Sequence, residues 1–97
     1  VLLSSDPMLY YVMAKNEQCL GEYRQAEKHL LHAIDILPER IYPYYLLMNL
    51  YTEPSYFQPA KLKMAIDSVL TKKPKVESSA IKEMKEKARS MLNNTSI

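Results

Sequence analysis

Few side chains in this 97-residue sequence could do chemistry, and the first to consider are two histidines, His29 and His32. Their spacing of three places both on one face of a helix, where two imidazoles could bind one metal ion. No third ligand lies close by in the sequence, so we expect no metal site. Asp35 follows His32 by three residues, which makes a surface pair the simpler interpretation.

The single cysteine, Cys19, is the other candidate for catalysis. A nucleophilic thiol needs an activating base and a site that stabilises the oxyanion, and the neighbouring residues indicate neither. Beside Leu20, the cysteine is better explained as a small apolar packing residue. The single glycine, Gly21, also leaves no material for a phosphate-binding loop. We therefore expect no catalytic site and no cofactor.

The charge is unevenly distributed along the chain. Residues 1–57 carry four basic and seven acidic side chains, whereas residues 58–97 carry nine basic and four acidic ones. A nucleic-acid binder that ignores sequence would need a denser basic face, so binding of DNA or RNA through residues 61–89 is only an alternative. We expect no nucleic-acid partner.

No apolar run approaches the roughly 18 residues that a membrane-spanning helix needs. The opening Val1-Leu2-Leu3 is too short for the core of a signal peptide, and the chain begins without Met. We expect a fragment of a longer protein, with no insertion of this segment into a membrane. The sequence does not indicate the compartment.

A 34-residue spacing connects the aromatic and apolar positions. Five pairs of similar residues recur at that distance: Tyr10 and Tyr44, Met13 and Leu47, Tyr23 and Phe57, Ala26 and Ala60, and Leu30 and Met64. This period is typical of a helix, a turn and a second helix that stack on the next such unit. The composition agrees, because Leu, Met, Ala, Glu and Lys favour helices. The sequence therefore predicts an all-α fold.

The first unit, about residues 7–40, is predicted to hold two helices. Asp6-Pro7 marks a helix start, because Asp caps free amides and Pro is tolerated at the first helical position. A helix over 8–20 ends at Gly21, which can adopt the left-handed conformation, and a second helix covers 22–37. The predicted inward positions are Leu9, Tyr10, Met13, Ala14 and Leu20, then Tyr23, Ala26, Leu30, Ala33, Ile34 and Leu37.

The second unit, about residues 41–74, repeats this plan with a different turn. Its first helix should run from about Ile41 to Glu53. Pro54-Ser55 replaces the glycine turn, so we expect a longer and stiffer loop before a helix that starts near Gln58. The run Lys72-Lys73-Pro74-Lys75 should end that helix, because cations suit a helix C-terminus and Pro cannot continue it.

The repeat becomes less regular in the last helix of the second unit. The 34-residue match predicts Ala60 and Met64 as core residues, with Tyr44 and Phe57 as aromatic packing positions. Asp67, however, falls where Ala33 predicts a small buried residue. The inward face is continued by Ala65, Val69 and Leu70, as though one residue had been inserted or the register had rotated.

A last helix, about residues 78–92, should cover the second unit as a lid. Ser78 or Ser79 can cap it. Glu83 and Lys87 make an i,i+4 pair on its outer side. Its apolar stripe consists of Ile81, Met84, Ala88, Met91 and Leu92.

These positions resemble tetratricopeptide repeats (TPRs) over about residues 7–73. In the order of that family, the first unit reads Tyr10, Met13-Ala14, Gly21, Tyr23, Ala26, Leu30, Ala33 and Pro38. Glu17 departs where the family prefers an aromatic residue, which the second unit supplies as Tyr51, and the second unit lacks the turn glycine. The resemblance implies a TPR-like superhelix, a single domain over residues 1–97 with two helix-turn-helix repeats and a capping helix.

The resemblance also implies a ligand groove along the concave face, which the first helix of each TPR mainly lines. By spacing, this face carries Met8, Tyr11, Lys15 and Gln18 from the first repeat and Tyr42, Tyr45, Asn49 and Thr52 from the second. The candidate ligand residues are Tyr11, Lys15, Gln18, Tyr45 and Asn49. The two tyrosines would form an amphipathic platform, and Lys15 with Asn49 could hold a carboxylate or a peptide backbone. The other interpretation is that these residues face solvent, or that the tyrosines pack against an upstream repeat.

A narrower resemblance is carried by Tyr42–Leu47, Glu53–Pro59 and Lys72–Met84. These stretches are similar to the soluble C-terminal repeat region of bacterial inner-membrane proteins of the O-antigen ligase and polymerase type. The likeness implies a parent enzyme that moves lipid-linked glycans, with this chain on the cytoplasmic or periplasmic side. The sequence lacks the membrane helices that carry that chemistry, so no catalytic residue is transferred.

The sequence thus predicts a non-catalytic scaffold that binds a protein or peptide. The alternative is an accessory assembly domain of a glycan-transferring membrane enzyme. Two repeats are fewer than the three usually needed for a stable stack, so we expect the N-terminal face of the first unit to be covered. The cover would be residues 1–5, a second copy of the chain in a homodimer, or upstream repeats.

Overall fold

The structure is a computed structural model that describes residues 6–73 and 78–94. Over those residues the chain forms helices joined by short loops, and no strand is present. The elements are α1 (Pro7–Cys19), α2 (Tyr23–Ile36), α3 (Tyr42–Tyr51), the 3₁₀ turn η1 (Pro54–Tyr56), α4 (Pro59–Thr71) and α5 (Ser79–Asn94). The prediction of an all-α fold is confirmed, and most predicted helix ends lie within two residues of the observed ones.

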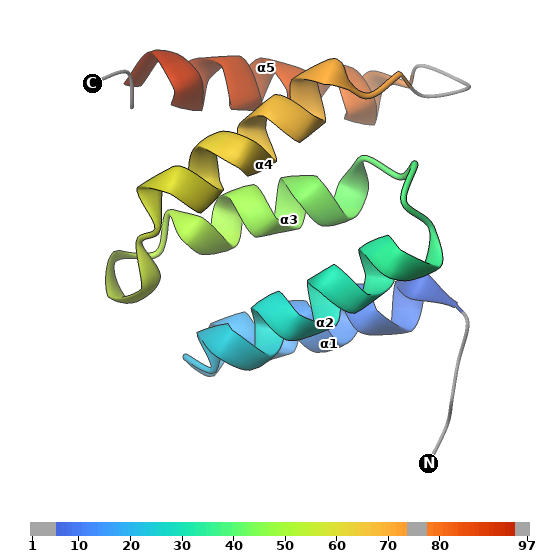
Figure 1. Ribbon diagram of the computed structural model, residues 1–97, viewed down its shortest axis with the longest axis vertical. Coiled ribbons are helices and arrows are strands. Elements are labelled where there is room, and N and C mark those ends of the chain that lie inside the picture. The colour runs from blue at the N-terminus through green and yellow to red at the C-terminus, as the bar shows by residue number, and fades with distance from the viewer. Residues whose placement is uncertain (1–5, 74–77, 95–97) are drawn as a thin grey trace.

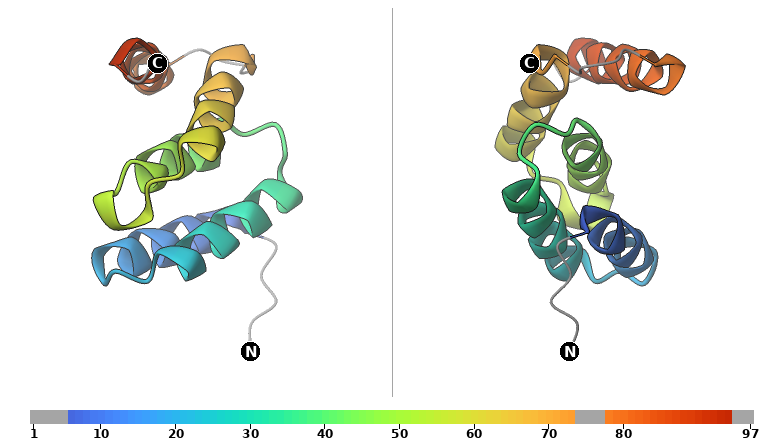
Figure 2. Two further views of the ribbon diagram at one scale, coloured as in Figure 1. Left: turned by 60° about the vertical axis from the view of Figure 1, so that its left-hand side comes forward. Right: turned by 90° about the vertical axis from the view of Figure 1, so that its right-hand side faces the viewer.

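The helices follow one another along the long axis of the molecule (Figure 1). α1 packs on α2, α2 on α3, α3 on α4 and α4 on α5. In the right-hand view of Figure 2, α2 and α4 lie on one side and α1, α3 and α5 on the other. Helices of odd and even number therefore form two layers, and the odd layer includes the predicted lid.

The turn between α1 and α2 is made possible by Gly21. This residue has a φ of 80°, in the left-handed region that glycine adopts at little cost. The amide of Gly21 donates to the carbonyl of Gln18 at 3.1 Å, and the amide of Glu22 donates to the carbonyl of Glu17 at 2.8 Å. These two bonds form a Schellman motif, which satisfies carbonyls that the helix end leaves free. The predicted stop of the first helix at Gly21 is confirmed.

Two side-chain caps agree with the sequence. The Asp6 carboxylate accepts a hydrogen bond from the amide of Met8 at 3.0 Å, with Pro7 in the first turn. The Ser78 hydroxyl accepts from the amide of Ile81 at 3.3 Å at the start of α5. The starts of the first and last helices are therefore encoded locally.

The core runs through all five helices. Ala14, Ala26 and Ala33 are buried, as predicted, and their small side chains let α1, α2 and α3 approach closely. Tyr10 and Tyr44, the first matched pair, are both half-buried and pack against the core. The largest fully buried side chains are Leu30, Pro43, Met48, Leu50, Leu62, Ile66 and Val69.

The predicted register of α4 is partly wrong. Ala60 is exposed and the Met64 side chain is 71% exposed, so neither is a core residue. The buried positions are offset by 36 residues from those of α2: Leu62 follows Ala26, Ile66 follows Leu30 and Val69 follows Ala33. The longer loop at 52–58 shifts the second helix of the unit by two residues relative to the first. Predicted Ala65 and Val69 are buried, and Leu70 is half-buried against the core.

The same loop corrects one aromatic assignment. Phe57, predicted to be a packing position, is exposed, whereas its neighbour Tyr56 packs against the core. Three leucines predicted to point inward are also exposed, namely Leu9, Leu20 and Leu37. The last two lie at the C-caps of α1 and α2, where the helical stripe ends, and Leu9 is 37% exposed.

The lid prediction holds for α5. Ala88 is fully buried, and Ile81, Met84 and Met91 pack against the core, whereas Leu92 is exposed. Within the described ranges, no helix is long and apolar enough to cross a membrane. Residues 1–5, one of the predicted covers for the N-terminal face, lie outside the described residues.

Candidate functional site

The residues of the predicted ligand groove lie on α1 and α3, and they differ in how far they are exposed. Tyr11 is only 6% exposed, and its ring meets Tyr42 edge-on with centroids 5.0 Å apart. Tyr45 is half-buried and stacks on the same Tyr42 ring, with the two centroids 6.4 Å apart. Tyr42 therefore links the two predicted tyrosines, and most of Tyr11 belongs to the core rather than to an open platform.

Cations lie over the rings of this tyrosine cluster. The Lys15 ammonium of α1 lies 5.2 Å from the Tyr42 ring centroid, and the Lys87 ammonium of α5 lies 5.5 Å from that of Tyr45. Lys87 was expected to pair with Glu83, but its described contact is with the ring of Tyr45. We define the cation–tyrosine surface as Lys15, Tyr42, Tyr45 and Lys87. Each ammonium is attracted to the electron-rich face of a ring while remaining open to an anion.

The two predicted amides have different roles. The Gln18 side chain donates to the Glu53 carboxylate at 2.7 Å and so ties the end of α1 to the end of α3. Asn49 is half-buried, and its backbone carbonyl accepts a hydrogen bond from the Thr52 hydroxyl at 2.7 Å. Gln18 therefore contributes to the packing of the two units, and Lys15 contacts Tyr42 rather than Asn49 in the described structure.

A buried carboxylate lies on the opposite layer, between α2 and α4. Glu27 of α2 is 9% exposed. It accepts a hydrogen bond from the Tyr51 hydroxyl at 2.6 Å, another from the Tyr56 hydroxyl, and one from the Lys61 ammonium at 3.1 Å. These donors come from α3, η1 and α4, so this single side chain links four elements.

The hydrogen bonds decide the charge of Glu27. Burial alone would raise the pKa of its carboxyl, but the bonds from Tyr51, Tyr56 and Lys61, with the positive charge of Lys61, hold that pKa below its usual range. Burial, followed by the bond to the Glu27 carboxylate, raises the pKa of Tyr51 and of Tyr56. At neutral pH the group is therefore an ionised carboxylate held by two neutral phenols and one cation.

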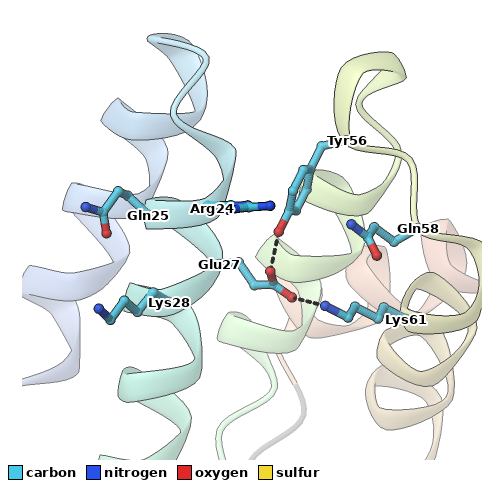
Figure 3. A pocket seen from close by; sticks show the side chains of 7 residues that line it. All are labelled: Arg24, Gln25, Glu27, Lys28, Tyr56, Gln58 and Lys61. Carbon is cyan, nitrogen blue, oxygen red and sulfur yellow. Dashed lines mark hydrogen bonds and ion pairs between the residues drawn. The ribbon is translucent and has the colours of Figure 1, made fainter.

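A cavity of about 720 Å³ opens beside this carboxylate (Figure 3). Figure 3 shows Arg24 directed toward Tyr56, whereas Lys28 points away from that ring. Since Glu27 is already occupied by three donors, the cavity can bind by charge and hydrogen bonds but holds no free base. Its walls are formed by Arg24, Gln25, Glu27, Lys28, Tyr56, Gln58 and Lys61.

The two histidines and Cys19 belong neither to the cation–tyrosine surface nor to the cavity beside Glu27. His29 Nδ1 lies 2.7 Å from a Glu17 carboxylate oxygen, and the rings of His29 and His32 flank Tyr10, with centroids 6.0 and 4.6 Å away. No group of three or more His, Cys, Asp or Glu side chains that could hold a metal ion occurs in the part of the chain that the structure describes. Cys19 is exposed at the end of α1.

Sequence reasoning missed Glu27, Tyr56, Lys61 and Lys87. One signal for the buried ion pair was present, because Glu27 and Lys61 are separated by the same 34 residues as the apolar matches and carry opposite charges. Nothing in the sequence placed Lys87 near Tyr45, because that contact depends on how α5 lies across α3.

No family model, curated protein or solved structure shows a significant match to this chain. The family resemblance therefore rests on the residue pattern alone.

Proposed function

We propose that this protein is a non-catalytic scaffold of the TPR type that binds a protein or peptide along its odd-numbered helices. The succession of helices supports the proposal, because antiparallel pairs that pack in chain order leave one helix of each pair on a common side (Figure 2). In this arrangement α5 takes the place of the first helix of a further unit.

The cation–tyrosine surface is the observation that carries the proposal. It brings together side chains from α1, α3 and α5, which are far apart in sequence. Tyrosine rings offer apolar area with a polar edge, and a lysine above each ring offers a positive charge. The partner that fits is a peptide that carries acidic side chains next to apolar or aromatic ones.

The proposal is tested by selecting peptides from a displayed random library on the immobilised protein. We expect the selected peptides to be enriched in Asp and Glu beside apolar residues. The affinity of the best synthetic peptide, measured by fluorescence anisotropy, should fall about tenfold in a Lys15→Ala, Lys87→Ala double variant, which corresponds to roughly 1.4 kcal/mol. Both lysines are exposed, so the fold should be unaffected.

The matched control is a Lys63→Ala, Lys82→Ala double variant, which removes the same charge from exposed positions of α4 and α5. Its affinity should stay within about twofold of the wild type. If both double variants weakened binding equally, net charge rather than this surface would be responsible. A selection without acidic enrichment would count against the proposal as well.

A further inference from the structure

One side of α1 is apolar and exposed. The Met8 side chain is 59% exposed and that of Val12 is 51% exposed, with Leu9 and Leu20 also open to solvent. On a helix with about 100° between successive residues, these four side chains fall on one arc together with Asn16 and Cys19. We call Met8, Leu9, Val12, Asn16, Cys19 and Leu20 the outer arc. It contains no charged side chain.

Three of the corresponding positions, all on α3, are buried. Thirty-four residues after Leu9, Val12 and Asn16 lie Pro43, Leu46 and Leu50. Pro43 and Leu50 are fully buried, and Leu46 is 7% exposed. The middle of this arc is therefore covered in the second unit and open in the first.

The α1–α2 hairpin is what covers the arc of α3. On one side of the arc the Tyr42 ring contacts Tyr11 of α1, and on the other side the Tyr51 hydroxyl donates to Glu27 of α2. Leu46 lies roughly 40° around α3 from Tyr42, between these two contacts. Leu50 and Pro43 follow within the same interval. An antiparallel pair of helices thus buries this arc in the second unit.

We propose that the outer arc of α1 is a docking surface for a further helical hairpin, stacked on the first unit as α1–α2 stack on α3. The interface that α1–α2 form with α3 would then be repeated between the further hairpin and α1. A helix face left open in the first unit but buried in the second is explained by an occupant of the same shape.

The chemistry of the occupant differs from that of α1–α2 at one position. The equivalent of Tyr51 in α1 is Glu17, which lies next to His29. A hairpin identical to α1–α2 would bring its own carboxylate, at the position of Glu27, toward Glu17. Two carboxylates at that distance repel each other. The occupant is therefore apolar toward the outer arc and uncharged at the position of Glu27.

The test is an extended chain in which residues 7–40 are repeated once, directly before Pro7. The added hairpin carries Cys19→Ser, so that the original Cys19 is the only thiol, and either Glu27 or Glu27→Leu. With Leu, we expect the midpoint of thermal unfolding to lie about 5 °C above that of the form with Glu27. Alkylation of the original Cys19 by iodoacetamide should be at least about tenfold slower than in the 97-residue chain, where this thiol is exposed.

Val12→Asp in the original unit provides the control. It should remove both effects in the extended chain, because the charge would be buried under the added hairpin. The same substitution should move the midpoint of the 97-residue chain by less than about 2 °C, because Val12 is exposed there.

Three results would overturn the proposal. The first is equal reactivity of Cys19 in the extended and 97-residue chains, which is also what an unfolded added hairpin would produce. The second is equal stability of the forms with Glu27 and Leu in the added hairpin. The third is a dimer of the 97-residue chain in analytical ultracentrifugation that Val12→Asp dissociates, since a second copy would then be the occupant. Peptide binding at the cation–tyrosine surface is measured separately and can fail or succeed independently.

Discussion

At the scale of single residues, Glu27 is a buried charge whose hydrogen-bond and ion-pair partners are all provided by the fold. Its carboxylate accepts hydrogen bonds from Tyr51, Tyr56 and Lys61, which together outweigh the cost of burial and keep it ionised. No buried side-chain nitrogen or oxygen lacks a partner within the described residues. Removing the carboxylate would leave the buried Tyr51 hydroxyl without its acceptor, which is costlier than losing an exposed bond.

We predict that Glu27→Gln lowers the free energy of unfolding at pH 7 by about 2 kcal/mol, because the bonds lose their ionised acceptor. The folded pKa of Glu27 lies below its ordinary value near 4.5, so its contribution to stability is present above that pH and is lost as the pH falls through the folded pKa. Urea unfolding followed by circular dichroism between about pH 7 and pH 2.5 would measure both effects.

The loss of stability on acidification should be smaller in Glu27→Gln than in the wild type. Glu39→Gln, which removes an exposed carboxylate from the α2–α3 linker, serves as the control and should follow the wild type closely. If Glu27→Gln showed the full acid dependence of the wild type, other carboxylates would be responsible for it.

At the scale of elements, the loop between α3 and α4 determines which face of α4 meets the core. The loop at 52–58 includes η1 and replaces a three-residue glycine turn. It anchors Tyr56 to Glu27 and turns Phe57 outward. A shift of two residues rotates a helix by about 200°. For this reason Ala60 and Met64 are exposed, whereas Leu62 faces the core.

This register predicts opposite outcomes for two similar truncations in α4. Leu62→Ala should lower the free energy of unfolding by about 2 to 4 kcal/mol, because it leaves a cavity at a side chain that is 2% exposed. Met64→Ala should change it by no more than about 0.5 kcal/mol. Chemical unfolding of the two variants measures the difference directly. A larger loss of stability for Met64→Ala than for Leu62→Ala would instead indicate that α4 keeps the 34-residue register.

The glycine turn of the first unit offers a second test at this scale. Gly21→Ala meets no atom within 4 Å of the added carbon, so only its positive φ opposes the change. We expect a cost of about 1 kcal/mol for Gly21→Ala and a smaller cost for Gly21→Asn, because Asn tolerates the left-handed region better. The midpoint of thermal unfolding would show this order, and equal midpoints would mean that the turn can form without a left-handed residue.

At the scale of the whole molecule, the two ends of the stack differ. α5 packs its apolar residues against the core and leaves most of its charged residues exposed, whereas the outer arc of α1 is open. Stability in such stacks depends on contacts between neighbouring units, so the covered end should unfold cooperatively with the centre.

We predict that Ala88→Asp in α5 lowers the midpoint of thermal unfolding by roughly 10 °C, because an unpaired charge would be buried at a fully buried site. Ser90→Asp adds the same charge at an exposed position of the same helix and should have little effect. Hydrogen exchange would add spatial detail, with faster exchange in α4 and α5 expected for Ala88→Asp alone. Equal behaviour of the two variants would show that α5 is not needed as a cover.

The sequence by itself determined the class of fold, the helix positions and most of their ends. These features depend on interactions between residues close in the chain, such as the Asp6 cap, the Gly21 turn and the three-and-four spacing of Ala26, Leu30 and Ala33. The buried alanines followed from the same pattern, and α5 was recognised as a lid from its single apolar face.

Only the tertiary structure decided the register of α4, the burial of Tyr11 and the contacts of Glu27 and Lys87. Each of these depends on the path of a loop or on how one helix crosses another, and a difference of two residues in a loop reverses which side of a helix is inside. Local spacing therefore describes each helix, but the distances between helices decide which side chains meet.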